Sequence, residues 1–128
     1  MPLTPETSAA LQRASTATIT TVLLKKGIRR SWMRGPMPLP TAAGQRVVGP
    51  AFTLRFVPAR EDLATPKSWS SPKSTRGAIE AMPEGVVVVV DALGAGEAGI
   101  FGDILCSRMR KRRVAALITM GLSGMSQE

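Results

Sequence analysis

The pattern of apolar and polar residues predicts a helical start followed by alternating strands and helices. Thr4 followed by Pro5 is typical of a helix start, since Thr is a favourable N-cap and Pro suits the first helical position. The apolar positions that follow suit one or two helices over residues 4–27, with Gly27 as the C-terminal cap. Residues 31–44 are rich in Pro and Gly, which predicts a loop.

Three strands are predicted farther along the chain. In residues 46–57, Phe52, Leu54 and Phe56 alternate with polar positions after Pro50, as in a half-buried strand. The unbroken valine run that ends at Asp91 suits a strand covered on both faces. Residues 114–119 form a second apolar run of strand length, so we expect a second buried strand there.

Two helices are predicted between these strands. After a polar loop rich in Ser and Pro, a short helix is capped by Ser74 or Thr75 and stops before Pro83. The segment 101–113 suits a second helix, with Ile104, Leu105 and Met109 on its apolar side. Residues 85–119 then form a strand–helix–strand unit with parallel strands, so the expected fold class is α/β.

A glycine-rich turn joins the valine strand to the second helix, which opens with Gly102 and Asp103. Ligands of parallel α/β units lie beyond the carboxyl ends of the strands, and free N–H groups at a helix start favour an anion. A small carboxylate or phosphate is therefore one interpretation of this turn. In the other, Asp103 is only an acid in the first turn of a helix and the glycines only form the turn.

The composition excludes several kinds of site. The 128 residues are 44% hydrophobic, enough for one small domain with a core, and they include no histidine. Histidine catalysis and histidine metal ligands are thus excluded. The single cysteine, Cys106, allows neither an internal disulfide nor a cysteine metal cluster, and we expect it to fill space. No apolar run is long enough to span a membrane and no signal peptide is evident, so we expect a cytoplasmic protein.

The net charge of +8 has two open interpretations. The basic residues gather in two segments, Lys25–Arg34 and Arg108–Arg113. They could form a surface for nucleic acid, although no known nucleic-acid module accompanies them. They could equally be solvated helix ends, where cations are favoured by the helix dipole.

Three stretches carry a resemblance to a known family. They are STATITTVLLKKG, VVGPAFTLRFVPAREDLATP, and the region from AIEAMPEGVVVVVD through GIFGDILCSRMRKRRVAALIT. Together they resemble the RraA-like family, which includes regulators of ribonuclease activity and 4-hydroxy-4-methyl-2-oxoglutarate aldolases. The most specific part is a Val-rich strand that ends in Asp, followed by Gly-Asp at the start of a helix.

The resemblance implies a layered α/β sandwich that assembles as a homotrimer or hexamer. It also implies chemistry for the aldolases of the family: a divalent metal, usually Mg²⁺, holds a 2-oxo acid and stabilises a pyruvate enolate. Backbone N–H groups of the Gly-Asp turn would bind the substrate carboxylate, which places Gly102, Asp103, Ile104 and Leu105 in the substrate site. Asp103 would also be the catalytic acid.

The family signature is only partly present. It consists of an acid, twenty residues, an Arg-Asp pair, two residues and another acid. With Asp103 as the first acid, the Arg-Asp positions fall on Gly124 and Met125, and Glu128 takes the place of the last acid. The substrate-binding Arg and the metal-ordering Asp are therefore missing, and no convincing metal ligand remains.

A shifted reading frame would explain this departure. Allowed codons for Thr119–Glu128, read one base out of frame, encode Asp-Gly-Ala-Val-Arg-Asp, which matches the family motif. We therefore expect a single RraA-like domain over 1–128, truncated at its C-terminus, with an α/β core at 46–119 and a departure from the family at 120–128. A diverged paralogue is the alternative.

Two functions remain open from the sequence. In the first, the ancestral protein is a metal-dependent aldolase or decarboxylase that releases pyruvate from 2-oxo acids such as 4-hydroxy-4-methyl-2-oxoglutarate, and this chain is inactive. In the second, the chain is a non-catalytic regulator that binds a ribonuclease, with the basic segments as contact surface.

Overall fold

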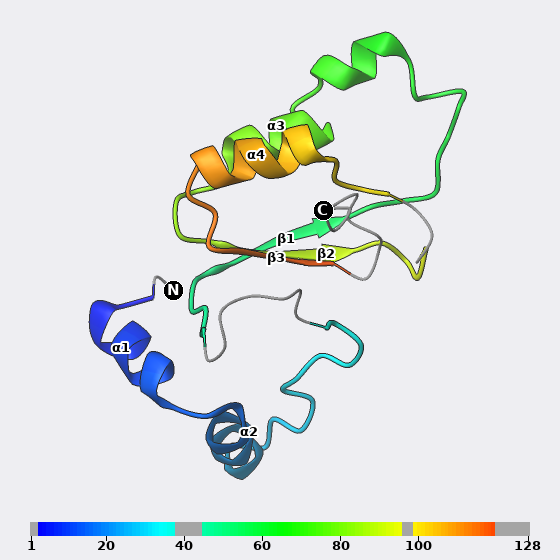
Figure 1. Ribbon diagram of the computed structural model, residues 1–128. Helices are drawn as coiled ribbons and strands as arrows, with labels where there is room; N and C mark the ends of the chain where they lie inside the picture. The colour runs from blue at the N-terminus through cyan, green and yellow to red at the C-terminus, as the bar shows by residue number, and fades with distance from the viewer. Residues whose placement is uncertain (1–2, 38–44, 96–98, 120–128) are drawn as a thin grey trace. The chain divides into compact units, whose positions relative to one another are not determined.

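A computed structural model of the chain describes residues 3–37, 45–95 and 99–119, which divide into two units. The first unit is Met1–Pro50 and the second is Ala51–Glu128. The first unit contains two helices and the second contains the sheet (Figure 1).

The predicted helical segment 4–27 consists of two helices, α1 (Pro5–Arg13) and α2 (Thr16–Lys25). Each starts with a hydroxyl cap that accepts a hydrogen bond from a backbone N–H. Thr4 Oγ1 accepts from Thr7 N at 3.2 Å, and Ser15 Oγ accepts from Thr18 N at 3.1 Å. The Ser15 cap divides the two helices, because a residue in the extended conformation that starts one helix must end the helix before it.

The second unit contains a parallel sheet of three strands: β1 (Ala51–Arg55), β2 (Val87–Asp91) and β3 (Ala116–Thr119). The strands lie in the order β1-β2-β3, with Thr53 beside Val89 and Val89 beside Ile118. The predicted α/β class and the strand–helix–strand unit within residues 85–119 are therefore confirmed.

Two helices cover one face of this sheet. They are α3 (Thr75–Ala81) and α4 (Asp103–Lys111), which lie side by side in Figure 1. The polar loop before α3 contains a short 3-10 helix, η1 (Pro66–Ser70), that the sequence pattern does not predict. The core between helices and sheet consists of Ile79, Met82, Val86, Val88, Val90, Phe101 and Met109.

The predicted first strand is too long. Residues 46–57 were expected to form it, but β1 covers only Ala51–Arg55. Pro50 has no N–H to donate to a neighbouring strand, and the register with β2 begins at Ala51. The alternation itself is confirmed, because Phe52, Leu54 and Phe56 pack against the core while Thr53 and Arg55 are exposed.

The valine strand is not covered equally on its two faces. Val88 and Val90 are buried beneath the helices, whereas Val87 and Val89 are only half-buried. The unbroken run of valines predicts equal cover, but β-branched side chains favour a strand whether or not both faces are packed. The apolar run therefore identified the strand and gave the wrong burial for one face.

The apolar side of α4 also differs from the prediction. Met109 is buried and Leu105 packs against the core, but Ile104 is 77% exposed. Leu105 and Met109 are four residues apart and share one face of the helix, while Ile104 is turned about 100° away from Leu105. Ile104 is therefore free to line a surface groove, described below.

Gly77 is required by a close approach of backbone to backbone. A Cβ atom at this position of α3 would lie 2.6 Å from the carbonyl oxygen of Pro72 and 2.8 Å from that of Ser71. Gly77 N also donates to the Ser74 side chain at 3.1 Å, which confirms Ser74 as the helix cap. The turn at 71–74 is thus pressed against the first turn of α3.

Replacing Gly77 with Ala should destabilise the second unit. The clash with two backbone carbonyls costs about 1–3 kcal/mol, which outweighs the gain in helix propensity of at most about 1 kcal/mol. Denaturant unfolding measures the change, with Gly99→Ala as the control because a Cβ at Gly99 meets nothing within 4 Å. Equal stability of the two variants would contradict this account.

Helices α2 and α4 end in the same way with different residues. After α2, Gly27 has φ +84° and Ile28 N donates to the Leu23 carbonyl at 2.9 Å. After α4, Arg113 takes the corresponding left-handed position with φ +58°, and Val114 N donates to the Met109 carbonyl at 3.1 Å. Glycine occupies this position at little steric cost, whereas an L-residue with a Cβ is strained there.

Replacing Arg113 with Gly should therefore stabilise the chain, by about 0.5–1 kcal/mol once the greater freedom of Gly in the unfolded chain is counted. The exposed ion pair with Glu84 that would be lost contributes little. Thermal or denaturant unfolding measures the gain. Arg113→Ala loses the same ion pair but keeps the strain, so an equal gain from that variant would exclude backbone strain as the cause.

Candidate functional site

The three parallel strands end at one edge of the sheet, so the segments that follow them meet there. β1 ends at Arg55, β2 at Asp91 and β3 at Thr119. Ligands of such sheets lie at this carboxyl edge. The second unit therefore has one edge where its polar loops and the start of α4 come together.

Asp91 organises the turn that follows β2. Its Oδ1 accepts a hydrogen bond from Leu93 N at 3.0 Å, and its Oδ2 accepts one from Arg55 Nε at 2.9 Å. The Leu93 N–H and the Arg55 guanidinium hold the pKa of Asp91 below its usual range, because both favour the carboxylate. Leu93 takes a left-handed conformation with φ +53°, and this turn carries the chain away from the sheet.

Phe101 anchors the start of α4. This side chain is buried and meets the ring of Phe56, just after β1, edge to face with centroids 6.0 Å apart. Gly102 follows as the N-cap, with an ordinary φ of −82° and open space where a Cβ would lie. A rigid apolar base therefore carries an exposed helix start.

The N–H groups at this helix start are only partly satisfied. Ile104 N donates to Asp103 Oδ1 at 2.8 Å, and Cys106 N donates to the Gly102 carbonyl at 3.0 Å. The N–H groups of Asp103 and Leu105 have no acceptor in the part of the chain that the structure describes. Two donors at the positive end of the helix dipole thus face outward, an arrangement that favours an anion.

An open groove of about 780 Å³ lies beside this helix start. Its walls come from the end of β1, from η1 and the start of α3, and from residues 102–105. Three cations and one acid border it: Arg55, Lys73, Arg76 and Asp103. Trp69 adds an exposed aromatic face. The balance of charge around the groove is positive.

The structure brings part of the predicted site together. Gly102, Asp103, Ile104 and Leu105, predicted to bind a carboxylate, all line the groove. Gly124, Met125 and Glu128 lie outside the described residues. Lys73 and Arg76 were not predicted as site residues, and the only local signal at their positions is the helix cap at Ser74.

The described residues do not form a site for a resident divalent metal. No group of three or more Cys, Asp or Glu side chains placed to hold a metal occurs among residues 3–37, 45–95 and 99–119. The one carboxylate that borders the groove and has no cationic partner there is Asp103, and one of its oxygens accepts from Ile104 N. Mg²⁺ needs several oxygen ligands, so Asp103 alone does not make a site.

Cys106 does not suit a nucleophile. The thiol is half-buried in α4, and burial together with the nearby Asp103 charge raises its pKa. Only the thiolate attacks, so a raised pKa lowers its reactivity. The predicted filling role agrees with this environment.

The comparisons with known proteins agree with this architecture. A family model described as RraA-like: Aldolase/RraA matches residues 16–123. The chain belongs to the RraA-like family. No curated protein matches the chain.

A solved structure extends this assignment to three dimensions. The RraA-like chain is similar to Streptomyces coelicolor RraAS2, described as an unusual member of the RNase ES inhibitor RraA protein family. The two share 33% sequence identity with a TM-score of 0.78, over 94% of this chain and 56% of the other. The chain thus spans little more than half of that relative's length. No helix in the described residues is long and apolar enough to cross a membrane.

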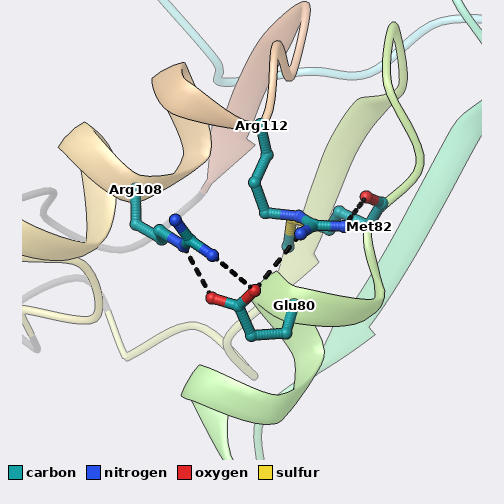
Figure 2. A network of polar contacts seen from close by, with 4 residues as sticks. All are labelled: Glu80, Met82, Arg108 and Arg112. Carbon is teal, nitrogen blue, oxygen red and sulfur yellow. Dashed lines mark hydrogen bonds and ion pairs between the residues drawn. The ribbon is translucent and has the colours of Figure 1, made fainter.

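The second basic segment of this RraA-like chain is mostly paired with acids of its own fold. Arg108 of α4 donates to both oxygens of Glu80 in α3, at 2.7 and 2.8 Å, as Figure 2 shows. Arg112 donates to Glu80 Oε2 at 3.2 Å and to the Met82 carbonyl at 2.9 Å. Arg113 donates to Glu84 at 2.9 Å. Three of the cations therefore join α4 to α3 and to the turn after it.

These contacts predict a pH-dependent stability. The hydrogen bond from Arg108 and the charges of Arg108 and Arg112 hold the pKa of Glu80 below its usual range. A carboxylate whose pKa is lowered by folding stabilises the protein above its unfolded pKa, and this contribution is lost as the pH falls through the lowered value. Glu80→Gln should therefore cost more stability at pH 7 than at pH 3.

Denaturant unfolding at the two pH values measures this difference. Glu61→Gln is the control, since no ion pair of Glu61 occurs among the described residues. If Glu80→Gln lowered stability equally at pH 3 and pH 7, the network would not depend on the charge of Glu80.

Proposed function

We propose that this RraA-like protein binds a small 2-oxo acid in the groove beside α4 and does not cleave it. The seat would be inherited from a divalent-metal-dependent aldolase or decarboxylase acting on 4-hydroxy-4-methyl-2-oxoglutarate-like substrates. The observation that carries the proposal is the exposed helix start at 102–105, with two outward N–H groups beside a positively bordered groove.

The chemistry of the groove supports a carboxylate ligand. The N–H groups of Asp103 and Leu105 would donate to one carboxylate, as anions are stabilised at the positive end of a helix. Lys73 and Arg76 add positive charge on the opposite wall, which raises the local concentration of anions. Apolar side chains from β1 and α4, among them Leu54 and Leu105, leave room for a short carbon chain.

The residues at the family signature support loss of turnover. Breaking the carbon–carbon bond of a 2-oxo acid leaves an enolate, whose negative charge a metal and an arginine would stabilise. Gly124 and Met125 stand at the signature positions for that Arg and for the metal-ordering Asp. Losing one such electrostatic group costs roughly 10²–10³ in rate, so two losses leave little activity.

Restoring the signature tests the proposal. The chain as it stands should bind Mg²⁺ with a dissociation constant on the order of 1 mM or weaker, as a lone carboxylate does, and release no pyruvate above background. Gly124→Arg combined with Met125→Asp should tighten Mg²⁺ binding and produce metal-dependent pyruvate release. Calorimetry measures the first and a coupled pyruvate assay the second. Micromolar Mg²⁺ binding or pyruvate release by the unaltered chain would contradict the proposal.

Gly102 allows the seat to be tested apart from turnover. In the restored variant, Gly102→Val should abolish binding of pyruvate or oxalate while the fold is kept, because the added side chain points into open space. Asp103→Asn should undo part of the gain in Mg²⁺ affinity. Unchanged ligand binding by the Gly102→Val variant would show that the turn is only structural.

A second function, regulation of a ribonuclease, is favoured by one specific observation. The solved relative is described as belonging to a ribonuclease-inhibitor family, and it resembles this chain over 94% of its residues. Inhibition of a purified ribonuclease by the unaltered chain, measured together with its assembly as a trimer or hexamer, would favour this function. Gly102→Val should then have no effect on inhibition.

A further inference from the structure

The excess positive charge of the chain lies mainly in its first unit. Residues 1–50 contain seven Lys and Arg and a single acid, Glu6, so they account for six of the eight net charges. Five of these cations stand within ten residues, Lys25–Arg34, with no acid among them: Lys25, Lys26, Arg29, Arg30 and Arg34. Such a density of one sign needs a physical explanation.

The two basic segments of the chain differ in how their charges are paired. The ion pairs of the described residues all lie in the second unit, where Arg108, Arg112 and Arg113 contact acids. Lys25, Lys26, Arg29 and Arg30 are exposed, and their side chains have no hydrogen bond or ion pair with any described residue. Their charge is therefore not used within the fold of those residues.

The helix dipole explains only the first part of the segment. Lys25 and Lys26 stand at the C-terminal end of α2, where cations are favoured. This effect falls off within the last turn of a helix. Arg29, Arg30 and Arg34 follow Gly27 in chain that forms neither helix nor strand, so the dipole gives no reason for their charge.

An aromatic face lies within the same segment. Trp32 is 59% exposed, and the guanidinium of Arg34 lies 5.3 Å from its ring centroid. Ile28 and Met33, on either side of it in sequence, are exposed as well. Unpaired cations interleaved with an exposed aromatic ring are the elements that bind single-stranded nucleic acid: the cations contact phosphates and a base stacks on the ring.

We propose that Lys25–Arg34 binds single-stranded nucleic acid without sequence preference, by phosphate contacts from its Lys and Arg and by stacking of a base on Trp32. This site is separate from the groove beside α4 and does not depend on the proposed 2-oxo acid function. An exposed Trp face has no role in recognising the charge of an acidic peptide. Arg29–Arg34 form no helix that could enter the groove of a duplex.

Tryptophan fluorescence provides a direct test. The chain has two tryptophans, Trp32 and Trp69, so Trp69→Phe leaves Trp32 as the reporter. Titration of this variant with a single-stranded oligouridylate should quench its fluorescence. If all five cations contact phosphates, the logarithm of the binding constant should fall with the logarithm of salt concentration with a slope of about −3.5. Absence of quenching at low salt would overturn the proposal.

Charge-matched variants locate the site. Arg29→Ala with Arg30→Ala should reduce the slope by about 1.4, at about 0.7 for each lost phosphate contact on a single strand. Arg110→Ala with Lys111→Ala removes the same charge from the exposed last turn of α4 and should leave the slope unchanged. If both pairs lowered the slope equally, the binding would be a response to total charge and the proposal would be wrong.

The role of Trp32 and the class of partner need two further measurements. In the wild-type chain, Trp32→Ala should weaken oligouridylate binding at least about fivefold at constant salt, as loss of one stacked base does, while circular dichroism confirms that the helices remain. Polyglutamate of equal charge and vesicles of anionic lipid should bind more weakly than the oligonucleotide. Equal or tighter binding of either competitor would assign the segment to an acidic protein or a membrane surface instead.

Discussion

The contact between two helices and one face of the central strand is the interaction on which the second unit depends. Val88 of β2 and Met82, just after α3, have no exposed surface, and Ile79 and Met109 close the layer from α3 and α4. Burying four such side chains contributes on the order of 1.5–3 kcal/mol each. The same contact fixes where α4 begins, and so it also determines the position of the groove at the carboxyl edge.

The sequence predicts the order of the elements well because their local signals are strong. Thr4 with Pro5, Ser74, Gly27 and the stop before Pro83 each depend on interactions within a few residues, and each has its expected role. The strands follow from runs of β-branched residues. What failed depends on neighbours distant in sequence: the start of β1 is set by its register with β2, and the burial of Val87 by the elements that pack nearby.

The candidate site divides along the same line. Gly102–Leu105 are predictable because a glycine turn that leads into a helix has a local signature and a family resemblance supports it. Lys73, Arg76 and Trp69 come from a polar loop whose sequence resembles any solvated loop, and only the packing of Gly77 against Pro72 brings that loop beside α4. The two basic segments look alike in sequence, yet one is paired with Glu80 and Glu84 and the other is not, a difference that composition does not contain.

The edge-to-face pair of Phe56 and Phe101 separates the base of the groove from its walls. Both rings belong to the core, so substitutions there would be selected against for stability alone. The wall that contains Trp69 and Lys73 is exposed, and surface substitutions usually change stability by less than about 0.5 kcal/mol. Natural variation can therefore exchange the wall residues one at a time and alter what the groove accepts, while the helix start that faces the ligand stays in place through the history of the family.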